Sequence, residues 1–122
     1  MIKLLQWVTR IAGILALLLG ISRWAGPGIA PLAVHMAVGG LVALALGILA
    51  LWALIGRVRI PVAIVALLWA AATVFVGTVQ DWWVGGASHL LIQILHPLLG
   101  IGAIGLAEVL AAALTRRRAS LG

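Results

Sequence analysis

Four apolar stretches divide this chain, and each is long enough to cross a lipid bilayer as a helix. They run over residues 4–22, 31–55, 61–80 and 88–115. Since a helix needs about 20 apolar residues to cross the hydrocarbon core, each stretch predicts one span. Of the 122 residues, 66% are hydrophobic, more than a soluble domain of this size can bury. We therefore expect one all-α domain over residues 1–122, an integral membrane four-helix bundle with up-down-up-down topology.

The basic residues predict how this bundle is oriented. Seven of them fall at one end of the expected bundle, and Arg23 falls at the other. The seven are Lys3, Arg10, Arg57, Arg59, Arg116, Arg117 and Arg118. Because basic residues stay on the cytoplasmic side of membrane proteins, we expect a multi-pass protein of the cell inner membrane with both termini cytoplasmic. We attribute the net charge of +6 to basic residues that orient the chain in a membrane. We therefore expect the lipid bilayer, and no nucleic acid, as its partner.

Two histidines occupy equivalent places in the second and fourth stretches. His35 precedes Gly39 by one helical turn, and His96 precedes Gly100 in the same way. Each histidine is also followed by an arginine after the same number of residues, Arg57 or Arg118. This spacing predicts two imidazoles held at one depth in the membrane.

The likeness extends to the two halves of the chain. The first and third stretches each end in a glycine, Gly20 or Gly77, and a tryptophan follows it. We interpret the halves as two parallel-repeat hairpins related by a pseudo-two-fold axis along the membrane normal, which places the second stretch opposite the fourth. The alternative is that apolar sequences of Leu, Ala and Gly align through their narrow composition alone.

Small and polar residues recur at helical spacing in every stretch, which predicts a bundle with room at its centre. Helix packing alone would explain the glycines, and intramembrane histidines can also form hydrogen bonds or handle ions and protons. Two histidines on such seams favour a cofactor. We expect His35 and His96 to be the axial metal ligands of haem b, with Gly39 and Gly100 leaving space for a flat macrocycle. With no cysteine, thiolate and iron–sulfur sites are excluded.

This pattern resembles the membrane-embedded b-type cytochromes, in which a four-helix bundle carries a bis-histidine haem between its second and fourth helices. The matching residues are His35 and His96. Two-haem members carry a second histidine further along each helix, where this chain has Leu49 and Leu110. The resemblance therefore implies a single haem in the outer half of the bilayer, serving one-electron transfer with a quinone or a redox partner protein.

Three further polar residues lie near the expected haem. His89 could replace His96 as a ligand, bond a haem propionate or, with Gln93, contact a quinone headgroup; the favoured alternative is an interfacial histidine in contact with water. Arg23 is another candidate for a propionate. Trp24 is expected in an interfacial aromatic belt.

The remaining polar residues do not assemble a catalytic set. The serines lie at the ends of the stretches, and no phosphate-binding loop is present, which argues against hydrolysis and nucleotide-driven transport. Glu108 is expected to pair with Arg57 or Arg59, or with a partner protein. We expect an electron-transfer protein rather than a substrate-converting enzyme. The competing class is a cofactor-free accessory or scaffold membrane protein with helix packing only, and the sequence is compatible with an oligomer in either case.

Overall fold

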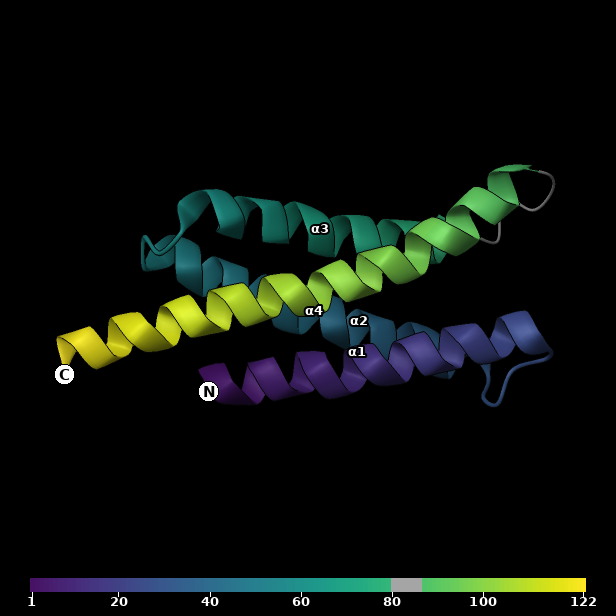
Figure 1. Cartoon of the computed structure of the whole chain (residues 1–122), viewed down its shortest axis with the longest axis horizontal. Helices are drawn as coiled ribbons and strands as arrows, with labels where there is room; N and C mark the ends of the chain where they lie inside the picture. Colours follow the sequence, from purple (N-terminus) through teal and green to yellow (C-terminus); the bar gives the residue numbers. More distant parts are fainter. Residues whose placement is uncertain (80–86) are drawn as a thin grey trace.

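The computed structural model describes residues 1–79 and 87–122, with side chains from residue 90 onward in the second part, and it contains four helices in these parts (Figure 1). The helices are α1 (Ile2–Ala25), α2 (Leu32–Ile55), α3 (Ile60–Val79) and α4 (Ala87–Leu121). All four are long and apolar enough to cross a membrane. The all-α, four-helix prediction is therefore confirmed.

Successive helices run in opposite directions along the bundle. Both termini and the α2–α3 link lie at one end of the molecule, on the left in Figure 1. Helices α2 and α4 pack against each other, and each also packs against α1 and α3. The histidine-bearing helices therefore form the inner pair of the bundle.

Small side chains fill the core between the helices from the middle of the bundle to the end that holds the termini. Ala50 of α2 and Ala103 of α4 have no exposed surface, as expected where small residues let two helix backbones approach closely. Leu49 and Leu110 are also completely buried. These two leucines fill the core of this half of the bundle with hydrocarbon.

The outer surface of the bundle is apolar on all four helices. Exposed large side chains include Leu4, Ile11, Leu44, Leu68, Phe75 and Ile101. A soluble monomer rarely exposes so much contiguous apolar surface, whereas a lipid-facing surface requires it. The helices are therefore arranged as candidate membrane spans, with polar side chains gathered between them or at the ends.

Helix α4 is longer than the stretch that we expected to end at residue 115. It continues through three arginines to Leu121 and spans 35 residues. Arginine is a good helix former, and positive charge in a last turn interacts favourably with the helix dipole. The end of the apolar stretch therefore did not coincide with the end of the helix.

A tryptophan of α3 fixes α4 just after its internal proline. Pro97 removes one backbone donor from α4. Two residues later, the Leu99 carbonyl accepts a hydrogen bond of 2.8 Å from Nε1 of Trp69. The Trp69 ring lies directly over Gly102, in space that a Cβ atom would occupy. The glycine thus makes room for the ring that holds the two helices together.

We expect Gly102→Ala to destabilise the protein because the added methyl group would collide with the Trp69 ring. Overpacking of this kind costs about 1–3 kcal/mol. Gly105→Ala is the matched control, since a Cβ atom there would meet no other atom within 4 Å. Thermal unfolding in detergent, followed by circular dichroism, should show a lower melting temperature for Gly102→Ala alone; equal melting temperatures would contradict the packing argument.

An ion pair connects α1 to α4 in the other half of the bundle. The guanidinium of Arg10 donates to both oxygens of Glu108, with Nη2 at 2.7 Å from Oε2. Gln6 donates a further hydrogen bond of 2.6 Å to Oε2, and the Arg10 guanidinium lies 4.9 Å from the centre of a Trp7 ring. The expectation that Glu108 pairs with Arg57 or Arg59 is therefore wrong. Those arginines lie beyond the end of α2, whereas Arg10 lies within α1, the helix packed beside α4.

Candidate functional site

The two histidines of the inner helix pair face each other across the interior. His35 lies in the first turn of α2, and His96 is the tenth residue of α4. Their ring centroids are 5.8 Å apart, and the ring planes are inclined by 63°. In both rings Nδ1 is buried and has no hydrogen-bond partner. Unsatisfied buried nitrogens are costly, so a hydrogen-bond donor or another partner at these two nitrogens would stabilise the pair.

Each imidazole rests on a glycine of the preceding helix. A Cβ atom on Gly20 of α1 would lie 3.3 Å from Cε1 of His35. A Cβ atom on Gly77 of α3 would lie 3.4 Å from Cε1 of His96. The same contact thus occurs once in each hairpin. Larger side chains at these two positions would press on the rings and displace them.

Two cavities meet at the histidine pair. The first lies between α1 and α4, and the second lies between α2 and α3. His35, His96, Gly39 and Thr73 line both cavities. The two rings therefore have free space on two sides.

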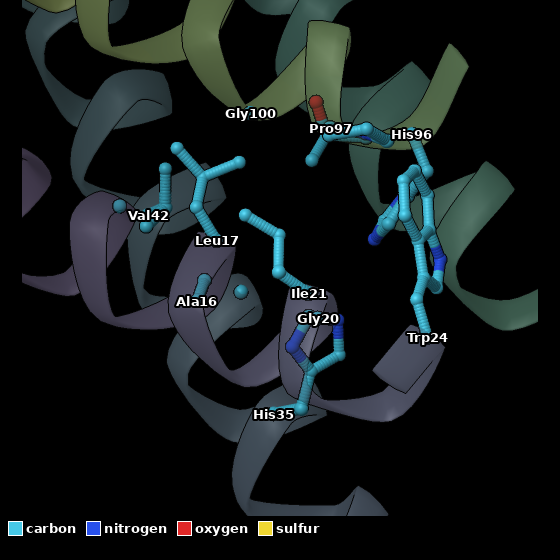
Figure 2. A pocket seen from close by; sticks show the side chains of 13 residues that line it. Ala16, Leu17, Gly20, Ile21, Trp24, His35, Val42, His96, Pro97 and Gly100 are labelled. Atoms are coloured by element: carbon cyan, nitrogen blue, oxygen red, sulfur yellow. The ribbon is translucent and has the colours of Figure 1, made fainter. Parts of the chain in front are cut away.

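Most of the lining of the first cavity is apolar. In Figure 2, Leu17, Ile21 and Trp24 of α1 lie opposite Pro97 and Gly100 of α4. The rings of the two histidines point into the space between these helices (Figure 2). Such a lining excludes water and leaves the imidazoles as its strongest polar groups.

The spacing of the rings suits a single metal ion. Because metal–imidazole nitrogen bonds are about 2 Å long, two rings that grip one ion from opposite sides have centroids about 6 Å apart. The observed 5.8 Å is close to this value. The described residues contain no cluster of three or more histidine, cysteine, aspartate or glutamate side chains. A metal at this pair would therefore need most of its ligands from elsewhere, and a porphyrin supplies four nitrogens.

The space beside the rings is smaller than a macrocycle. Each cavity has a volume of about 70 Å³, whereas pockets for cofactors and drug-sized ligands start at roughly 300 Å³. Helix α1 would have to move outward to admit the group, while α2 and α4 keep the two rings at their present spacing. Helices α1 and α4 already diverge toward this end of the bundle, on the right in Figure 1, and Gly39 leaves open space on α2.

The structure places the other predicted residues in different ways. Gly100 lines the first cavity, where a Cβ atom would lie 3.5 Å from the Leu17 side chain. Arg23 turns to the α1–α2 link and donates a hydrogen bond of 3.3 Å to the Ala30 carbonyl. Gln93 is half-buried on α4, one turn before Pro97. The side chain of His89 lies outside the described residues.

Two residues of the site received no cofactor role from the sequence. Trp24, which we expected in an interfacial belt, lines the first cavity near His96 (Figure 2). Thr73 lines both cavities and donates its hydroxyl hydrogen to the Trp69 carbonyl at 2.8 Å. Trp24 follows Gly20 by one turn, so helical spacing alone could have placed it on the same face. Comparisons with protein-family models, with curated proteins and with solved structures found no match to this chain.

Proposed function

We propose that this chain is a membrane-embedded b-type haem protein for one-electron transfer, with His35 and His96 as the two axial ligands. The observation that carries the proposal is the facing pair of half-buried imidazoles, 5.8 Å apart, each with an unsatisfied buried nitrogen. Intramembrane polar groups are costly and usually face an interior where they have a task. Two imidazoles from different helices that line the same two cavities are the basis for proposing axial ligation rather than helix packing alone.

The residues around the pair would have separate tasks. Gly20 and Gly77 set the position of the two imidazoles, because each ring rests directly on one of them. Gly39 and Gly100 keep space free beside the rings. When bound, haem b would supply an iron that exchanges one electron between its ferric and ferrous forms. The apolar lining would exclude water and so help set the reduction potential.

The membrane placement belongs to the same proposal. The four candidate spans would lie in the cell inner membrane with both termini cytoplasmic, as the basic residues near the termini and in the α2–α3 link favour. The histidines would then lie in the outer half of the bilayer. The equal His–Gly contacts in both hairpins support the parallel repeat. A quinol in the membrane or a redox protein outside it would be the electron partner.

The experiment that tests the proposal is a titration of the purified chain with hemin in detergent. We expect saturation at one haem per chain, because the core holds one facing histidine pair among the described residues and Leu49 and Leu110 close the other half. Saturation at two haems would contradict the single-site assignment. If hemin uptake does not saturate and is no greater than in detergent alone, the result would favour the cofactor-free accessory protein.

We expect Gly39→Leu to prevent haem binding without destabilising the haem-free protein. A leucine side chain there would extend into the space that both cavities share, and a Cβ atom at this position meets nothing within 4 Å. Leucine also favours a helix over glycine by roughly 0.8 kcal/mol. Hemin affinity should fall at least tenfold, while the melting temperature of the haem-free protein stays equal or rises.

Gly47→Leu is the control for this substitution. Gly47 lies on the same helix two turns further on, and a Cβ atom there also meets nothing within 4 Å. It lines neither of the two cavities at the histidines. Normal hemin binding by Gly39→Leu, or equal losses in the two variants, would show that these cavities do not receive the cofactor.

A further inference from the structure

An arginine cluster lies at the end of the bundle that holds both termini, far from the histidines. It consists of Arg57 and Arg59 in the α2–α3 link and of Arg117 in α4. All three side chains are exposed. The cluster takes no part in the haem binding proposed above.

The backbone of the link holds two of these arginines in a conformation that side chains rarely adopt. Arg57 has a φ of 52° and Arg59 has a φ of 45°. Two hydrogen bonds end α2 around Arg57: its own amide donates to Leu54, and the Val58 amide donates to the Ala53 carbonyl at 2.7 Å. This is the Schellman arrangement, in which glycine usually occupies the left-handed position.

Glycine stands next to this position and has a different task. Gly56 has a right-handed conformation with a φ of −74°, so it does not relieve the strain of the turn. The guanidinium of Arg117 lies directly over it, in space that a Cβ atom would occupy. Gly56 therefore allows the last turns of α4 to place Arg117 against the end of α2, next to the link that carries Arg57 and Arg59. Two arginines with positive φ and one arginine packed on Gly56 thus lie at the same end of the bundle.

No side-chain carboxylate among the described residues neutralises these three charges. Glu108 is the one acidic side chain in the described residues, and its oxygens accept hydrogen bonds from Arg10 and Gln6. Strained residues that persist in a fold commonly mark a functional position. The natural complement of clustered guanidiniums is an anion with several oxygens, and phosphate matches their forked donors.

We propose that Arg57, Arg59 and Arg117 form a binding site for the phosphate group of an anionic phospholipid such as phosphatidylglycerol. The cluster lies where candidate span α2 ends and candidate span α3 begins, which would be the depth of lipid headgroups. Ile55 and Ile60 flank the link and expose 82% and 42% of their surfaces. A lipid would thus find apolar side chains for its acyl chains directly beside the arginines, whereas a soluble phosphate would leave them uncovered.

Native mass spectrometry of the full chain in a non-ionic detergent tests this site. The probes are phosphatidylglycerol, zwitterionic phosphatidylcholine and inorganic phosphate. We expect the wild-type chain to retain one phosphatidylglycerol at a concentration where it retains no phosphatidylcholine. The triple variant R57Q/R59Q/R117Q should bind phosphatidylglycerol at least tenfold more weakly.

Two single variants separate the site from general surface charge and from misfolding. Arg57→Gly removes one guanidinium and supplies the residue that the left-handed turn prefers, so the melting temperature should not fall while lipid retention falls several-fold. Lys3→Gln removes one exposed charge near the N-terminus and should change retention by less than twofold.

Three results would overturn the proposal. The triple variant could retain phosphatidylglycerol as well as the wild type does. Lys3→Gln could lose as much lipid as Arg57→Gly, which would show attraction by net charge alone. Millimolar inorganic phosphate could displace the lipid completely, which would assign the arginines to a soluble anion.

Discussion

His35→Ala and His96→Ala should each reduce the haem content of the purified protein to the background of a detergent blank. Each substitution removes one of two facing imidazoles, and the described lining of the two cavities contains no third histidine, cysteine or carboxylate that could ligate iron in its place. The cavities at the pair are otherwise lined almost entirely by apolar and small residues. Haem content is measured by the pyridine haemochrome absorbance per chain after purification.

Two further variants make this result specific to axial ligation. His89→Ala should keep its haem, since we assign the axial position on α4 to His96. His96→Gly should recover a low-spin spectrum when free imidazole is added, because the cavity beside the ring can hold the small molecule. Loss of haem in His89→Ala with retention in His96→Ala would reassign the ligand. Full haem content in all three alanine variants would refute ligation by histidine.

Glu108→Ala should cause the largest loss of stability among the substitutions of polar residues. It removes the shared acceptor of Arg10 and Gln6 and leaves the guanidinium unpaired within a candidate span. Removing one partner of an ion pair is far more damaging in a low-dielectric environment than removing both, because the remaining charge stays uncompensated. We expect a clear fall in melting temperature in detergent, together with increased aggregation.

The double variant Arg10→Ala/Glu108→Ala is the matched test of this explanation. It should melt at a higher temperature than Glu108→Ala alone, although it contains one substitution more. Glu108→Gln should be intermediate, because an amide can still bond to Gln6 but carries no charge. If Glu108→Ala melts as the wild type does, the ion pair does not hold α1 to α4.

The four helices were predictable from the sequence because lipid imposes a simple rule. A backbone in hydrocarbon must satisfy its own hydrogen bonds, so any apolar stretch of about 20 residues is read as a helix. The rule does not determine where a helix ends beyond its apolar stretch. It therefore did not predict that α4 extends past residue 115 to Leu121. It also does not determine side-chain partners: charge alone allowed Glu108 several arginines, and only the packing of α1 beside α4 selects Arg10.

The candidate site was predictable only in part. Equal spacing identified His35 and His96 as a pair, and the structure brings their rings together. Helical periodicity also marked Gly39 and Gly100. It could not show that Trp69 of α3 donates a hydrogen bond to the Leu99 carbonyl of α4, since that contact depends on which face α3 turns toward the residues after Pro97. Helical periodicity also could not show that the present space beside the rings is too small for a macrocycle.

The absorption spectrum of the hemin-loaded protein, before and after dithionite, tests the central claim most directly. Two imidazole ligands predict a six-coordinate low-spin haem, with a sharp reduced α-band in the green that carbon monoxide does not change. A broad reduced band that shifts on addition of carbon monoxide would show an open axial position. That result, or a chain that takes up no haem at all, would contradict the assignment of His35 and His96 as joint ligands of one iron.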